Sequence, residues 1–308
     1  MMLRPWLQFF RLPNLPTAPA HALAGPVMGV AHPGGDVRHA LVAGAAALFL
    51  YMYGLADNDL VGAKSDEVNA PERPIPRGEI SLRSARIARS TCLFLALVLG
   101  ALFNLPSAWW MGAVALTGLI CLYNRVKSKW LMGLCRGASL LCGVMAVARP
   151  SVLTNEAWKM AGHSPEWTIA ALVAMVFGWT LYIAAVTKIS EGEESASEGL
   201  GKWRFVLGLS ALVPLIACAA FPNPRQALLP LIGGLWTFVS WCAAVAPLGE
   251  PHESAVRRAA VGRTIGALLY LQIGFMLVTP HREFLAVAIA LWLAARFIRR
   301  FASHISGS

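Results

Sequence analysis

Three oxygen-bearing side chains lie close together in the stretch GLADNDLVGAKSDEVNAPERPIPRGEI, which runs from Gly54 to Ile80. Asp59 and Asp66 are seven residues apart, so on a helix their directions differ by about 20° and they share a face. Asn58 adds a neutral amide oxygen beside them. Magnesium prefers such ligands and typically takes one or two carboxylates, several waters and substrate phosphate oxygens. The spacing therefore predicts a Mg²⁺ site formed by Asn58, Asp59 and Asp66.

Cations follow these acids, and we expect Arg73 and Arg77 to meet the charge of a bound phosphate. Asp57 points about 200° away from Asp59 around a helix, so it is not expected to join the site. The later acids of the stretch are expected to be solvated loop residues. Three prolines end the helix and hold the following segment extended: Pro71, Pro74 and Pro76.

A second acidic stretch, KISEGEESASEGLGKWR, occupies residues 188–204. Glu191 and Glu194 are three residues apart and share a helical face, and Lys188 and Lys202 flank them. Two acidic clusters, each with cations, around one cavity would suit a Mg²⁺-bound diphosphate on a lipid-like tail. For this stretch alone, mixed charge that only solvates a loop is the alternative.

The rest of the sequence indicates a membrane protein. It is 57% hydrophobic and 14% charged, with a mean hydropathy of +0.58, whereas a soluble domain is usually about a quarter charged. The six cysteines lie in apolar runs and indicate small buried residues, not disulfides or zinc ligands. We therefore predict an all-α polytopic membrane protein.

Ten apolar stretches are long enough to be spans, and because the last two are closely joined, we expect nine or ten transmembrane helices. If both termini are cytoplasmic, 21 of the 26 lysines and arginines lie on the cytoplasmic side, as in a protein of the bacterial cytoplasmic membrane. The net charge of +10 then reflects topology and lipid headgroups, not nucleic acid. The stretches are 15–32, 37–56, 85–103, 106–123, 130–148, 167–187, 203–220, 226–246, 260–279 and 283–299.

We expect one domain over residues 1–308, with a retained cytoplasmic segment at 1–14. The connectors at 57–84 and 188–204 each follow the second helix of a four-helix unit. This arrangement indicates two pseudo-repeated four-helix units around a central cavity, with both connectors at its cytoplasmic mouth.

The first connector resembles a known motif. Asn58-Asp59, then Asp66 and NAPERPIPRGEIS look like the first aspartate-rich motif of the UbiA superfamily of intramembrane prenyltransferases, N-D-x-x-D-x-x-x-D followed by R-P-[IL]-P-x-G. The stretches RLPNLPTAPAHALAG and LYNRVKSK resemble that family's first helix and its Tyr…Lys/Arg segment, and residues 188–204 lie where its second motif belongs. The resemblance covers nearly the whole chain.

The resemblance implies Mg²⁺-dependent transfer of a prenyl group from an isoprenoid diphosphate to a small or lipid-like acceptor within the membrane. Two positions depart from the pattern. Gly62 stands where the middle aspartate would fall, and the second motif has glutamates only, so two-metal chemistry is left open. The wording PERPIPRGEIS also occurs in family members that act on ether-lipid precursors, but it does not fix the acceptor.

Further polar residues have more than one possible role. Arg125 and Lys127 are either diphosphate ligands or topology anchors. Arg136 lies inside a predicted span, where a charge usually faces the bundle interior and marks function. The residues expected around the acceptor or the cavity are Arg11, Asn14, His21, Tyr123 and Arg136. His21 could equally be a hydrogen-bonded interior histidine.

Two other function classes compete with prenyl transfer. A non-catalytic protein of the same fold could bind an isoprenoid lipid or assist pathway assembly. A transporter is disfavoured, because its site would lie near the bilayer midplane and the acids here gather at the cytoplasmic ends.

Overall fold

A computed structural model describes residues 3–26, 36–147, 165–190, 208–220, 224–249, 254–278 and 281–306. Over these ranges the chain is helical and has no strand, which confirms the predicted all-α class. The elements are α1 (Leu3–Phe9), η1 (Leu12–Asn14), α2 (Thr17–Ala24), α4 (Val37–Asn69), α5 (Leu82–Leu102), α6 (Ser107–Val126), α7 (Lys129–Val147), α9 (Pro165–Ser190), η3 (Ser210–Ala220), α11 (Pro224–Val245), η4 (Ala246–Gly249), α12 (Ser254–Met276) and α13 (Arg282–Ser306).

Within the described ranges, six helices are long and apolar enough to cross a membrane, and they lie in α4, α5, α7, α9, α11–η4 and α12. The protein is therefore an integral membrane protein. In the described ranges, each of the ten predicted stretches overlaps a helix or a 3₁₀ segment. The number that spans the bilayer stays a prediction.

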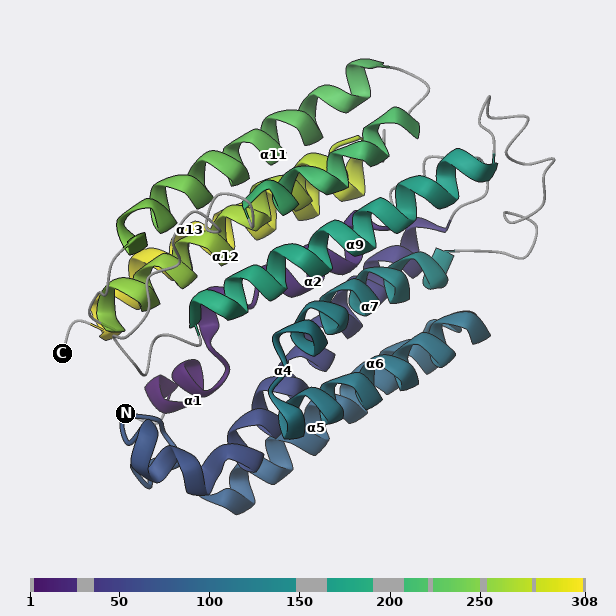
Figure 1. Cartoon of the computed structure of the whole chain (residues 1–308). Coiled ribbons are helices and arrows are strands. Elements are labelled where there is room, and N and C mark those ends of the chain that lie inside the picture. The colour runs from purple at the N-terminus through teal and green to yellow at the C-terminus, as the bar shows by residue number, and fades with distance from the viewer. Residues whose placement is uncertain are drawn as a thin grey trace.

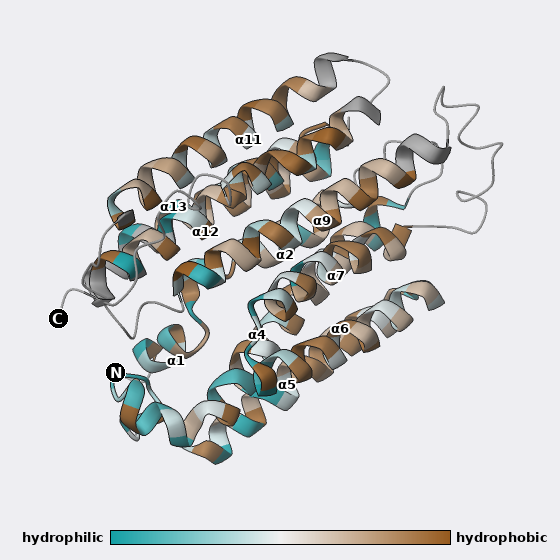
Figure 2. Ribbon diagram, in the orientation of Figure 1, coloured by the Kyte–Doolittle hydropathy of each residue, from teal (hydrophilic) through white to brown (hydrophobic). Residues whose placement is uncertain are grey.

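The helices lie side by side with their long axes roughly aligned (Figure 1). The beginning of α1, the turn from α4 to α5 and the last turns of α13 all lie at one end of this bundle. Hydrophilic residues gather where α4 gives way to α5, and hydrophobic residues follow the helices away from it (Figure 2). The charged connector thus lies at the same end as the segment before α2.

Helix α4 extends farther than its predicted span. It has 33 residues, a length of about 50 Å, whereas about 20 residues cross a bilayer. The side chain of Asp36 accepts hydrogen bonds from the first backbone amides of the helix, and the helix ends at Asn69, before Pro71. The first part of the predicted connector is therefore helical, because α4 contains no proline. This rigid extension carries Asp59 and Asp66.

Helix α7 lies between two cores. One core, around Trp109, joins α4, α5, α6 and α7, and the other, around Trp179 and Trp241, joins α7, α9, η3, α11 and α12. Two glycines of α7 allow this position. A Cβ at Gly143 would overlap the carbonyl oxygen of Ala22 in α2, and a Cβ at Gly133 would overlap a carbonyl oxygen of α9, as is typical of close helix pairs in membranes.

The helix packing resembles the expected pseudo-repeat in part. In the first unit α4 packs against α2 and α5, and in the second α9 packs against α7 and η3. The duplication itself stays a prediction.

Candidate functional site

The last turns of α4 hold two buried carboxylates, Asp59 at 5% exposure and Asp66 at 8%. Burying a charge is costly unless it is paired and hydrogen-bonded. The pairing comes from two arginines outside α4. Arg73 follows the helix in the connector, and Arg11 stands just before η1.

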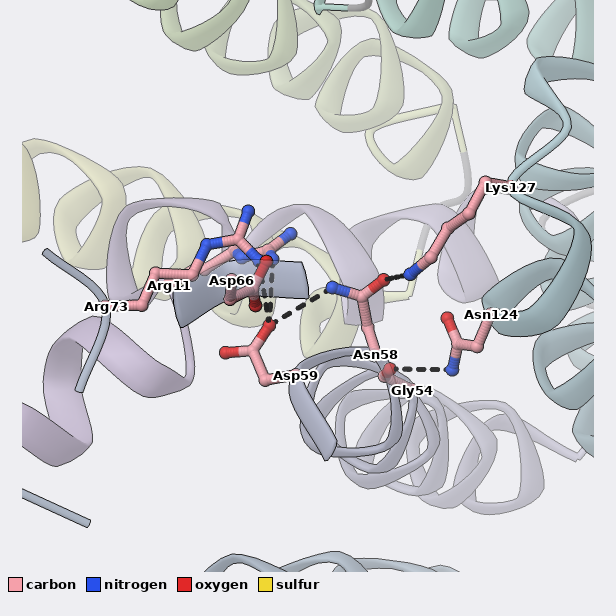
Figure 3. Close-up of polar contacts among 8 residues, drawn as sticks. All are labelled: Arg11, Gly54, Asn58, Asp59, Asp66, Arg73, Asn124 and Lys127. Atoms are coloured by element: carbon pink, nitrogen blue, oxygen red, sulfur yellow. Dashed lines mark hydrogen bonds and ion pairs between the residues drawn. The ribbon is translucent and has the colours of Figure 1, made fainter. Parts of the chain in front are cut away.

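Asp59 and Asp66 converge on a single nitrogen atom. The Nη1 atom of Arg73 lies 2.7 Å from Oδ2 of Asp66 and 3.8 Å from Oδ1 of Asp59. The Nη2 atom of Arg11 donates to the same Asp59 oxygen at 3.2 Å. Figure 3 shows both guanidinium groups gathered over the two carboxylates. One guanidinium nitrogen thus contacts both acids, whereas the Mg²⁺ site expected from the seven-residue spacing stays a prediction.

Asn58 connects this acidic pair to α6. Its amide nitrogen donates to Oδ1 of Asp59 at 3.1 Å, and its amide oxygen accepts a hydrogen bond from Nζ of Lys127 (Figure 3). Lys127 caps the end of α6 in a left-handed conformation, with φ 56°. Partial desolvation and then the positive charges of Arg11 and Arg73 lower the pKa of Lys127. An anion that bound here would relieve that crowding of positive charge.

Beneath these contacts lies a polar network that the sequence analysis did not find. Asn124 donates to Oδ2 of Asp57 at 2.8 Å and to the carbonyl oxygen of Gly54 at 3.2 Å. Arg89 of α5 donates to the other oxygen of Asp57 at 3.0 Å. Asp57 therefore joins α4, α5 and α6 and does not share the arginines of Asp59. The one sequence feature that pointed to this separate role is that Asp57 faces about 200° away from Asp59 on a helix.

A cavity of about 610 Å³, a volume that includes the space at its mouth, opens beside these residues. Asn58 and Arg11 line it together with side chains of α2, α4, α6 and α7. Its wall is mostly apolar, as in typical ligand pockets. Its polar and charged lining residues are Arg11, Tyr51, Asn58, Tyr123, Asn124, Arg136 and Ser139.

The donor set fits Mg²⁺. The described residues contain no group of three or more His, Cys, Asp or Glu side chains that could hold a metal. Two converging carboxylates are nevertheless enough for Mg²⁺, which typically takes one or two carboxylates, keeps several waters and takes phosphate oxygens from its substrate. The contact of one guanidinium nitrogen with both acids shows that a positive charge can sit between Asp59 and Asp66.

Three of the predicted site residues contact other groups of the protein. Arg77 pairs with Glu79 at 2.9 Å, and Arg125 donates to a backbone oxygen of its own helix, that of Cys121. His21 is fully buried and accepts a hydrogen bond from Gln272 of α12 at 2.8 Å.

Asn14 is the last residue of η1, and Lys188 lies in the last turn of α9. Tyr123 lines the cavity, with Nζ of Lys127 5.8 Å from its ring centre. Glu191, Glu194 and Lys202 lie outside the described residues, so their roles stay predictions.

Comparison with known sequences decides the family. The model of the UbiA prenyltransferase family matches residues 18–260. The chain belongs to this family. The resemblance seen in the sequence is thereby confirmed. The UbiA match begins after Arg11 and ends within α12, so α13 lies beyond it.

Among UbiA relatives, the digeranylgeranylglyceryl phosphate synthase of Ignicoccus hospitalis is 38% identical over 119 residues, which cover 37% of this chain and 38% of the relative. The enzyme of the same name from Methanococcus vannielii is 27% identical over 156 residues, or 49% of this chain and 56% of the relative. The chain thus matches less than two thirds of the length of these curated relatives.

The fold also matches a solved UbiA structure. The apo structure of a UbiA homologue from Aeropyrum pernix K1 superposes with a TM-score of 0.60 at 15% identity, over 86% of this chain and 96% of that one. A UbiA homologue from Archaeoglobus fulgidus bound to GPP and Mg²⁺ gives a TM-score of 0.50 at 16% identity, over 93% and 99% of the two chains. These likenesses establish the UbiA fold.

Gly62, one of the two departures from the UbiA pattern, lies next to the acidic pair. A Cβ added to Gly62 would lie 3.3 Å from Oδ2 of Asp66. A side chain at position 62 would therefore start within reach of Asp66.

Proposed function

We propose that this protein transfers a prenyl group from an isoprenoid diphosphate to a lipid-like acceptor in a Mg²⁺-dependent reaction. The observation that carries the proposal is the convergence of Asp59 and Asp66 on Arg73 beside the mouth of a largely apolar cavity. Carboxylates, cations and an apolar volume are the three features needed to bind a diphosphate joined to a hydrocarbon tail.

The residues of the chain would divide the work as follows. Asn58, Asp59 and Asp66 would hold Mg²⁺, which neutralises charge that develops on the diphosphate leaving group. Arg73 would turn from the two acids, and Lys127 from Asn58, to the phosphate oxygens of the bound donor. Arg11 would keep Asp59 oriented.

The apolar part of the cavity would accept the prenyl chain and keep bulk water from the reacting carbon. The allylic C–O bond breaks and its electron pair leaves with the diphosphate. The acceptor nucleophile then bonds to the allylic carbon and loses its proton.

Three relatives guide the choice of substrates. The homologue from A. fulgidus binds GPP with Mg²⁺, and the curated relatives are named for a digeranylgeranylglyceryl phosphate product. We therefore propose a prenyl diphosphate donor and rank a prenylated glyceryl phosphate first among acceptors. We further propose that the end of the bundle with the acidic pair faces the cytoplasm of a bacterial cell, because most lysines and arginines are predicted on that side.

The test is transfer by the purified protein in lipid nanodiscs, with a series of prenyl diphosphates and acceptors. Asp59→Ala and Asp66→Ala should lose more activity than the roughly 10- to 100-fold typical of residues that only orient a metal ligand. Glu67→Gln, an exposed neighbour on α4, is the matched control and should keep wild-type activity. Wild-type transfer by Asp59→Ala would rule out the assignment.

A non-catalytic role is the second candidate, and Gly62 is the observation that favours it, because it lacks the carboxylate of the family motif. Mg²⁺-dependent binding of prenyl diphosphates by the wild-type protein, without transfer to any acceptor in the series, would support this alternative.

A further inference from the structure

The cavity contains a second cationic position, away from the acidic pair. Arg136 of α7 lines it, and the central carbon of its guanidinium lies 4.4 Å from the ring centre of Tyr51 on α4. Tyr51 precedes Asn58 by seven residues, which is about 10 Å along a helix. Arg136 therefore stands about two turns farther into the bundle than the residues that contact Asp59.

Arg136 has no acidic partner among the residues that the structure describes. The ion pairs of the nearby aspartates use Arg11, Arg73 and Arg89. In the same described ranges, no oxygen accepts a hydrogen bond from the Arg136 guanidinium, which lies against the face of Tyr51. A charge inside a membrane bundle is costly, and such a residue usually pairs with an opposite charge or faces a cavity that serves function. The cation–π contact offsets only part of that cost.

We propose that Arg136, held against Tyr51, binds the anionic head group of the acceptor, a phosphate or a carboxylate. The proposal rests on the proposed function and assigns the second substrate a place in the same cavity. Two anionic substrates repel each other unless each has its own cation. Arg73 and Lys127 would bind the diphosphate of the donor, and Arg136, which lines the cavity, would bind the acceptor. A guanidinium binds such groups through two parallel hydrogen bonds, and Ser139, one turn farther along α7, lines the cavity beside it.

The first experiment measures binding without a donor. Three amphiphiles with the same prenyl chain are titrated into the protein in nanodiscs: a prenylglyceryl phosphate, a prenyl carboxylic acid and an uncharged prenylglycerol. Arg136→Gln should weaken binding of the better anionic ligand by about 10- to 100-fold, the range expected for lost charge-assisted hydrogen bonds. Binding of the uncharged amphiphile should not change. The stronger of the two anionic ligands in the wild type identifies the head group.

Two variants make the test specific. Arg86→Gln removes an exposed arginine of α5 and should bind all three ligands like the wild type. Tyr51→Leu removes the aromatic face that holds Arg136 and should weaken anion binding. If Arg136→Gln does not fold, Arg136→Lys and Tyr51→Leu carry the comparison, because lysine keeps the charge but loses the paired hydrogen bonds.

The second experiment measures turnover. Arg136→Gln should raise the KM for an anionic acceptor and leave the KM for the prenyl diphosphate unchanged. Equal affinity of wild type and Arg136→Gln for every anionic amphiphile would overturn the proposal. Failure of the proposed function would look different, since the wild type would then transfer no prenyl group while still binding the anionic amphiphile through Arg136.

Discussion

Asn124 and Asp57 form a hydrogen bond of 2.8 Å between two almost completely buried side chains, at 1% and 3% exposure. This contact fixes α6 against α4 where their functional residues meet. Asn58 follows Asp57 directly, and Lys127 comes about one turn after Asn124. The position of Lys127 against Asn58 therefore depends on a pair that lies deeper in the bundle.

Asn124→Leu should destabilise the protein by about 1–3 kcal/mol, because it leaves an oxygen of a buried, charged carboxylate without its donor. It should also raise the KM for the prenyl diphosphate, since Lys127 loses its fixed place. Thermal unfolding in detergent and steady-state kinetics measure the two effects. Asn69→Ala, which removes an exposed amide bonded to Ser65, should change neither quantity. An unfolding temperature and a KM equal to those of the wild type would show that the pair does not position the site.

Lys127 combines a charge with a backbone conformation that suits glycine. Its φ of 56° and ψ of 29° lie in the left-handed region, which costs a residue with a Cβ about 1 kcal/mol. Lys127→Gly should therefore unfold at a higher temperature than Lys127→Ala. Both variants remove the ammonium group and should weaken binding of a prenyl diphosphate equally. Measured affinities that differed between the two would indicate that the backbone, and not the charge, determines binding.

The acidic pair could be predicted from sequence because its geometry is local. Seven residues on one helix fix the relative direction of Asp59 and Asp66, and the helix continues until Pro71. The partners of the pair depend on contacts between distant segments. Arg11 lies 48 residues from Asp59, and it reaches that aspartate from a left-handed backbone conformation with φ 46° that no local pattern indicated.

Competition between partners also limited the sequence analysis. Arg77 has the type and position of a phosphate ligand, but Glu79 lies two residues away and pairs with it. His21 lies on an apolar helix, and its hydrogen-bond partner Gln272 lies 251 residues away in the sequence. In each case the residue type was informative, whereas the choice among possible partners was made by tertiary packing.

The glycines of α7 predict a strong contrast in stability. Gly143→Ala would place a Cβ against the carbonyl oxygen of Ala22, and overpacking of this kind typically costs about 1–3 kcal/mol. Gly118→Ala is the matched control on α6, because nothing lies within 4 Å of the added Cβ, and better helix propensity should stabilise it by up to about 1 kcal/mol. Thermal unfolding in nanodiscs should place the two variants on opposite sides of the wild type. A stable Gly143→Ala would show that α2 and α7 pack less closely than the structure indicates.

Gly62→Asp should make the unfolding temperature of the protein depend more strongly on Mg²⁺. The new side chain starts 3.3 Å from Oδ2 of Asp66, so a third carboxylate would join the acidic pair. Without metal the repulsion between like charges four residues apart on a helix should lower the unfolding temperature. With Mg²⁺ the extra ligand should reverse that loss, and the Mg²⁺ concentration at half-maximal stabilisation should fall. Gly62→Ala, which adds the Cβ without the charge, separates crowding from ligation and should show the wild-type Mg²⁺ midpoint. If Gly62→Asp and Gly62→Ala have the same Mg²⁺ midpoint, a carboxylate at position 62 does not bind the metal held by Asp59 and Asp66.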